Sequence, residues 1–206
     1  MRKRFVLRHT VLLFSLGLLF GLGCASSPPS RFYVLSSLEA GGRELKELRS
    51  GQDLTIVVGP ITFPEYLDRT EIVTRSGNNK ITFSAFDLWA GSLAEDFSRA
   101  LAENLSALLP TANVVVHHGP RPSSVDYRII VDVIRFDGPL GGDVSLIARW
   151  GIIKGKEKKV VFVRRSTIIE PSGTQGYEAM VAADSRALEK LSREIAESIK
   201  TLPKSS

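Results

Sequence analysis

The only cysteine of the sequence, Cys24, lies directly after an apolar run, and this N-terminal arrangement limits the fold more than any other feature. Four basic residues and no acidic ones precede the run: Arg2, Lys3, Arg4 and Arg8. The run, residues 11–22, is shorter than the roughly 20 residues that cross a bilayer as a helix. A basic start before a short apolar core is typical of an export signal. Residues 1–23 are therefore expected to be a signal peptide outside the folded domain.

Two kinds of cleavage fit the residues before Cys24. Gly21 and Gly23 are small enough for an ordinary signal peptidase, which would leave the cysteine thiol bare. Leu22-Gly23-Cys24 also resembles the end of a bacterial lipobox, in which the sulfur receives a diacylglyceryl group and the cysteine becomes the first mature residue. We favour lipidation of Cys24, because one unpaired thiol beside the cleavage site of an exported protein is otherwise hard to explain. An uncleaved anchor is the third alternative.

Residues 24–30 are expected to form a lipidated tether, since serine and proline make this segment flexible and partly extended. Attachment by more than one acyl chain would be effectively permanent, because each buried methylene contributes about 0.8 kcal/mol. Ala25 and Ser26 stand where lipoproteins retained in the enterobacterial inner membrane carry an aspartate. The tether therefore predicts the periplasmic face of the outer membrane of a Gram-negative bacterium.

The net charge of +5 would suggest nucleic-acid binding only if the predicted signal peptide, residues 1–23, is included in the count. Without the four basic residues of the leader, 23 basic residues face 22 acidic ones, which leaves no electrostatic footprint for a polyanion. The remaining chain is long enough for one domain with a sizeable core. Lipidation of the single cysteine would leave no thiol for a disulfide. We therefore expect one domain over residues 31–203 that folds by packing alone.

Stretches rich in β-branched and alternating apolar residues predict seven or eight strands. They cover residues 31–38, 53–61, 71–75, 80–86, 113–118, 126–138, 144–154 and 159–170. Tight turns join the last three, which predicts an antiparallel meander. In the stretch 126–138 one face is expected to carry Tyr127, Ile129, Val131 and Val133, and the other Ile130, Asp132, Ile134 and Phe136.

Two stretches have the period of an amphipathic helix. The first is expected to begin at Ser84, where Ser84-Ala85-Phe86-Asp87 resembles a relaxed capping box, and to end before Pro110. Its apolar face would contain Phe86, Ala90, Leu93, Phe97, Leu101, Leu105 and Leu108. The second covers residues 177–202. The prediction is an α+β domain with a largely antiparallel sheet and two long amphipathic helices packed on it.

The sequence lacks the local motifs of common enzymes, such as G-x-S-x-G, the P-loop, H-E-x-x-H or paired cysteines. His117 and His118 end a predicted strand, where alternation would point their rings to opposite sides, so neither a metal site nor a base is expected. We expect no enzyme activity, cofactor or metal, although a triad assembled from distant residues would leave no local motif.

The segment 59–75 combines prolines with aromatic and charged side chains in a short connection. Such residues are common in recognition surfaces. The candidate partner-contact residues are Phe63, Tyr66, Leu67, Asp68, Arg69 and Arg75. The alternative is structural, with an internal Asp–Arg or Glu–Arg ion pair that fixes the loop.

The stretch "YLDRTEIVTR" at residues 66–75 resembles the Y-L-D-R-P-x-I-V-T-R signature of the PqiC/YmbA family, the auxiliary lipoproteins of ABC-type intermembrane transport. Similar stretches elsewhere are "RFYVL", "DLWAGSLAEDFSRALAENLSALLP", "DYRIIVDVIRFDG", "SLIARW" and "YEAMVAADSRALEKLSREIA". Together they cover nearly the whole mature domain. The sequence differs from the family pattern at Thr70, where proline is common, and before Trp89, where an arginine is common.

The resemblance implies a non-enzymatic subunit of a lipid-transport apparatus at the outer membrane. Its partner would be an MCE-domain protein of the inner membrane that forms a tunnel, and a symmetric tunnel would suit a homo-oligomeric ring of this chain. The implied role is trafficking of phospholipids or other hydrophobic molecules and maintenance of envelope integrity. Two other classes stay open: a structural or regulatory lipoprotein that binds an assembly factor, and an envelope hydrolase.

Overall fold

The computed structural model describes residues 27–38, 54–109, 112–119, 122–155 and 157–202. Its elements are β1 (Arg31–Tyr33), β2 (Leu54–Thr62), η1 (Glu65–Leu67), β3 (Glu71–Ser76), β4 (Lys80–Trp89), α2 (Leu93–Leu108), β5 (Ala112–Val116), β6 (Tyr127–Asp137), β7 (Asp143–Lys154), β8 (Lys159–Pro171) and α3 (Tyr177–Thr201). The predicted α+β class is confirmed. The predicted signal peptide, Cys24, Pro110 and the last residue of the predicted domain lie outside the described residues. Among those residues, no helix has the length and apolar character needed to span a membrane.

The described strands form two sheets, one of five strands in the order β5-β2-β6-β7-β8 and one of three in the order β1-β4-β3. The predicted meander is confirmed, because β6, β7 and β8 pair antiparallel. β2 pairs parallel with both β5 and β6, and β1 pairs parallel with β4. Parallel neighbours need crossover connections, and the connection from β2 to β5 runs through β3, β4 and helix α2.

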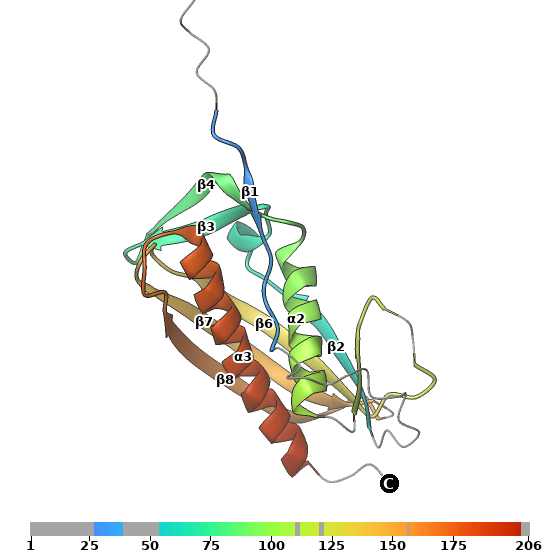
Figure 1. Cartoon of the computed structure of the whole chain (residues 1–206). Helices are drawn as coiled ribbons and strands as arrows, with labels where there is room; N and C mark the ends of the chain where they lie inside the picture. The colour runs from blue at the N-terminus through green and yellow to red at the C-terminus, as the bar shows by residue number, and fades with distance from the viewer. Residues whose placement is uncertain (1–26, 39–53, 110–111, 120–121, 156, 203–206) are drawn as a thin grey trace, which may run out of the picture.

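Helices α2 and α3 lie side by side on one face of the five-stranded sheet (Figure 1). Alternation along β6 places Ile129, Val131 and Val133 on one face, as predicted. This face lies under the helices, and each of the three side chains is at most 2% exposed. The helices contribute buried side chains spaced three and four residues apart, which include Phe97, Leu101, Leu105, Leu188, Leu191 and Ile195. The hydrophobic core therefore lies between this sheet and the helix pair.

The predicted start of the first helix at Ser84 is wrong. Residues 84–89 belong to strand β4, and α2 begins at Leu93 after Ser92, whose hydroxyl accepts the backbone N–H of Glu95. The Ser84 hydroxyl does accept the backbone N–H of Asp87, but inside an irregular strand. Residues 87–89 form a parallel β-ladder with β1, so this part of the backbone is not helical. Phe86 and Ala90 therefore do not belong to the apolar face of α2.

The predicted position of Phe136 on the outer face of its strand is also wrong. The register between β6 and β7 shifts between Val133 and Arg135, which leaves Ile134 as an extra residue. This bulge turns Phe136 back into the core, where it is 3% exposed and its ring meets that of Phe97 edge-on at 5.6 Å.

The segment that follows β1 runs between the two helices (Figure 1). The backbone N–H groups of Leu35 and Leu38 donate to Asp96 and Asn104 of α2, at 2.6 Å each, and that of Ser36 donates to Ser185 of α3 at 3.0 Å. The chain just after the predicted tether is therefore held by both helices.

Candidate partner-contact site

The connection between β2 and β3 contains most of the residues predicted to contact a partner. It turns through Pro64 and η1, where the N–H of Leu67 donates to the carbonyl of Pro64 at 2.9 Å. Leu67 is 2% exposed, and the half-buried Phe63 packs edge-on against Phe97 at 5.4 Å. These two side chains attach the loop to the core and are not presented at the surface.

A buried carboxylate, Asp137 at the end of β6, holds the loop from inside. Its two oxygens accept the Nε and a terminal nitrogen of Arg75 at 2.7 and 3.0 Å, and the hydroxyl of Tyr66 donates to it at 2.7 Å. Arg135 is a second cationic residue that donates to Asp137, through its Nε at 3.0 Å. Asp137 is 0% exposed, so its charge is satisfied entirely by protein groups.

The pKa values of this network follow from its geometry. Burial alone raises the pKa of Asp137, but the hydrogen bonds from Arg75 and Tyr66 outweigh burial and hold the pKa below the ordinary aspartate value. Burial, followed by the hydrogen bond to Asp137, raises the pKa of Tyr66 to about 12. The hydrogen bonds that Arg75 itself donates to Asp137 raise the pKa of Arg75. At neutral pH the network therefore consists of a neutral tyrosine and a fully ionised Arg–Asp pair.

A second buried carboxylate, Asp184 of α3, has the opposite character. It is 1% exposed, and within the described part of the chain its Oδ1 has no hydrogen-bond partner. Burial, and then the negative charge of Asp137, raise the pKa of Asp184 well above its ordinary value. The fold therefore favours a protonated, neutral Asp184.

The outer side of the loop is formed by the two remaining candidates, Asp68 and Arg69. Asp68 is exposed, and the guanidinium carbon of Arg69 lies 3.7 Å from the ring centre of Phe83, itself 43% exposed. We call Asp68, Arg69 and Phe83 the outer loop surface. Phe83 was absent from the predicted residues, since only the pairing of β4 with β3 brings it to the loop.

The structure thus divides the six predicted residues. Phe63, Tyr66, Leu67 and Arg75 support the loop. Asp68 is exposed, and the half-buried Arg69 lies on the exposed ring of Phe83. The predicted structural alternative, an internal ion pair, exists as Arg75–Asp137, with its carboxylate supplied by β6. In the sequence, only the position of Asp137 between a predicted strand and Gly138 could have indicated its role in this ion pair.

The expected arrangement of the two histidines is wrong. Strand β5 ends at Val116, so strand alternation does not govern His117 and His118, and their ring centres lie 5.1 Å apart. His117 Nδ1 accepts Arg128 at 2.8 Å. His117 also lines two cavities of about 320 and 410 Å³ on either side of β2. Among the described residues, no cluster of His, Cys, Asp or Glu is suited to a metal ion.

Comparison with known proteins gives a family match over most of the chain. A model of the family described as "ABC-type transport auxiliary lipoprotein component" matches residues 33–196. The intermembrane transport lipoprotein PqiC of Escherichia coli (strain K12) is 27% identical over 193 residues, which is 93% of this chain and 98% of that protein. The protein of the same name from Shigella flexneri matches to the same extent.

Two solved structures support the fold. The crystal structure of an uncharacterised protein has a TM-score of 0.69 at 21% identity, and covers 84% of this chain and 99% of that chain. A crystal structure of a protein from Xanthomonas campestris has a TM-score of 0.57 at 19% identity, with 69% and 81% of the two chains covered.

Proposed function

Because the chain belongs to the family of ABC-type transport auxiliary lipoprotein components, we propose that it is the lipid-anchored subunit of an intermembrane transport system. Lipidated Cys24 would attach it to the periplasmic face of the outer membrane, where it docks an MCE-domain tunnel protein of the inner membrane. Its role would be to support trafficking of phospholipids or other hydrophobic molecules and envelope integrity. The observation that carries this proposal is the similarity to an intermembrane transport lipoprotein over nearly the full length of both chains.

The outer loop surface is the proposed docking contact. Asp137 fixes the loop from inside through Tyr66 and Arg75, so the exposed side would be ordered before a partner arrives. Preorganisation of this kind lowers the entropic cost of binding. Arginine and aromatic side chains are enriched at the centres of protein interfaces, and here they are stacked as Arg69 on Phe83.

The same geometry favours docking over catalysis. The charged groups under the loop, Arg75, Arg135 and Asp137, are occupied with one another. A general base or nucleophile has to be available to a substrate, and these groups are not. We therefore propose that the protein contributes no chemical step of its own.

Site-specific photocrosslinking in cells tests the docking contact. A photoreactive phenylalanine analogue at Asp68 should form an adduct with an MCE-domain protein. The same analogue at Thr167, an exposed position on β8, is the matched control and should form none. Replacement of Cys24 by serine should remove the Asp68 adduct, because the domain is then no longer held at the membrane.

An adduct at Thr167 but not at Asp68 would place the contact elsewhere. An assembly factor as the only crosslinked protein would contradict the transport role.

A further inference from the structure

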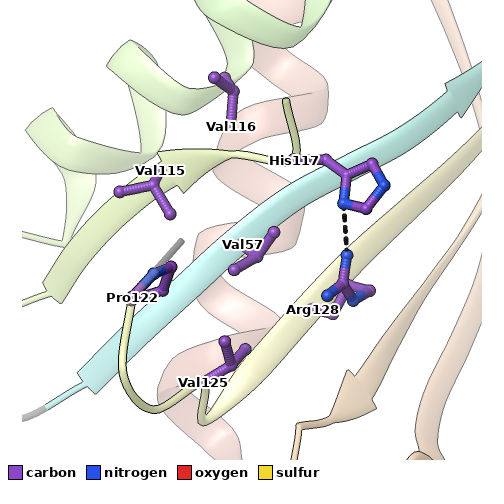
Figure 2. Close-up of a pocket in the computed structure, with 7 residues that line it drawn as sticks. All are labelled: Val57, Val115, Val116, His117, Pro122, Val125 and Arg128. Atoms are coloured by element: carbon purple, nitrogen blue, oxygen red, sulfur yellow. Dashed lines mark hydrogen bonds between the residues drawn. The ribbon is translucent and has the colours of Figure 1, made fainter. Parts of the chain in front are cut away.

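A small cavity lies beside the β5 edge of the five-stranded sheet, away from the outer loop surface. Its volume is about 320 Å³, at the lower end of the range for ligand pockets. Apolar side chains form most of its lining, and His117 and Arg128 are close together at one end (Figure 2). The lining residues are Val57, Val115, Val116, His117, Pro122, Val125 and Arg128.

The strand register explains why these side chains share one face. β2 lies between β5 and β6, and Val57 is the Cα partner of both Val115 and Arg128. Its neighbours Ile56 and Val58 point the other way, into the main core. Val57 is nevertheless only 4% exposed, because the loop with Pro122 and Val125 covers it (Figure 2). The cavity is therefore an apolar chamber on the sheet face opposite the helices.

The polar end of the cavity contains the guanidinium of Arg128, which donates hydrogen bonds to two neutral acceptors. Arg128 donates to His117 Nδ1 at 2.8 Å and to the carbonyl of Gly59 at 3.4 Å. Arginine can only donate, so a neutral His117 carries its proton on Nε2. Among the residues that the structure describes, no carboxylate forms an ion pair with Arg128. Arg75, in contrast, has a full counter-charge in Asp137.

We infer that this cavity binds a single-chain amphiphile with an anionic head group. The guanidinium of Arg128 receives the carboxylate or phosphate, since charge-assisted hydrogen bonds to such groups are the strong ones. The acyl chain lies along Val57, Val115 and Val125, where its burial removes apolar surface from water. The site is separate from the outer loop surface and exists whether or not that surface docks a partner.

Native mass spectrometry of the processed protein in a nonionic detergent tests this site, because the bound mass identifies the ligand. Laurate and dodecyl phosphate present the two anionic head groups on one chain length. Dodecanol is the neutral equivalent, and inorganic phosphate is the head group without a chain. We expect one laurate or one dodecyl phosphate per chain, and little dodecanol or phosphate.

Three variants locate the binding. Arg128→Met keeps the apolar stem of the side chain and should weaken both anionic amphiphiles at least about tenfold, without effect on the weak dodecanol binding. Val125→Phe fills the chamber and should abolish binding. Arg149→Met removes a 61%-exposed arginine elsewhere on the sheet and should bind like the wild type. Thermal melting by circular dichroism verifies that each variant is folded, and Val115→Phe replaces Val125→Phe if the latter is not.

Three outcomes would overturn the inference. One is that folded wild-type protein binds neither anionic amphiphile. Another is that Arg128→Met or the filled cavity binds them as well as the wild type does. The third is that inorganic phosphate alone binds as tightly as dodecyl phosphate, which would assign the site to the free ion. None of these affects the docking proposal, because the measurement contains no partner protein.

Discussion

Two arginines of this domain, Arg75 and Arg128, are in opposite electrostatic situations. Arg75 is bound through two nitrogens to the buried carboxylate of Asp137, and the pair holds a loop in place. Arg128 donates hydrogen bonds to a histidine nitrogen and a backbone carbonyl, and it lies beside an apolar cavity. An arginine that is paired with a buried carboxylate of the same chain stabilises the fold. An arginine without such a counter-charge beside an apolar cavity is available to bind an anionic ligand.

The loss of Asp137 should give the largest effect on the Arg75 side of this comparison. Asp137→Ala leaves Arg75 and Tyr66 without their acceptor, and breaking a buried pair in this way costs about 3–5 kcal/mol. Urea denaturation measures the free energy of unfolding. Asp132→Ala on the same strand is the control, because the ion pair of Asp132 with Arg149 is exposed and should contribute less than about 1 kcal/mol. Equal losses in the two variants would remove the structural role assigned to Asp137.

The two arginines can be compared directly by the same replacement. Arg75→Met should lower the free energy of unfolding by about 3 kcal/mol, since it leaves Asp137 buried with only Arg135 as a charged partner. Arg128→Met should lower it by about 1 kcal/mol, the usual contribution of a hydrogen bond between a side chain and neutral groups. Denaturation of both variants under one condition measures the difference. A loss at Arg128 as large as that at Arg75 would contradict the distinction drawn between them.

The buried carboxylates of Asp137 and Asp184 predict opposite pH dependences, which sharpen the comparison further. The pKa of Asp137 is lowered on folding, so its stabilisation is present above the ordinary aspartate pKa of 3.8 and is lost as pH falls through the lower folded value. The pKa of Asp184 is raised, so its contribution is present below 3.8 and is lost as pH rises through the folded value.

Asp184→Asn should therefore gain stability relative to the wild type as pH rises from the acidic to the neutral range. Urea denaturation across this range measures the slope, and any constant cost of the buried amide does not enter it. Asp132→Asn, at an exposed position, should keep the slope of the wild type. An unchanged slope in Asp184→Asn would mean that the buried carboxyl group is not held neutral.

The elements that sequence predicts well are those whose signals are local. The meander of β6, β7 and β8 and the stripe of α3 follow from alternation and from three- and four-residue spacing within one segment. The start of α2 was missed because the segment before it pairs with β1, whose Arg31 lies 56 residues away from its partner Asp87. A capping pattern carries no information about such pairing.

The candidate site was only half predictable for the same reason. The stretch "YLDRTEIVTR" identified the loop, but the inward orientation of Tyr66 depends on Asp137, 71 residues further along the chain. The histidines were assigned opposite orientations because the strand was expected to extend through them, whereas it ends at Val116. The contact of His117 with Arg128 arises only when β2 comes between β5 and β6.

Membership in a family of transport lipoproteins makes the state of one sulfur atom the centre of the functional proposal. Mass spectrometry of the N-terminal peptide from membrane-purified protein measures that state directly. The proposal predicts a peptide that begins at Cys24 and carries the added mass of a diacylglyceryl group. A mature peptide with an unmodified cysteine, or one that retains residues 1–23, would contradict it.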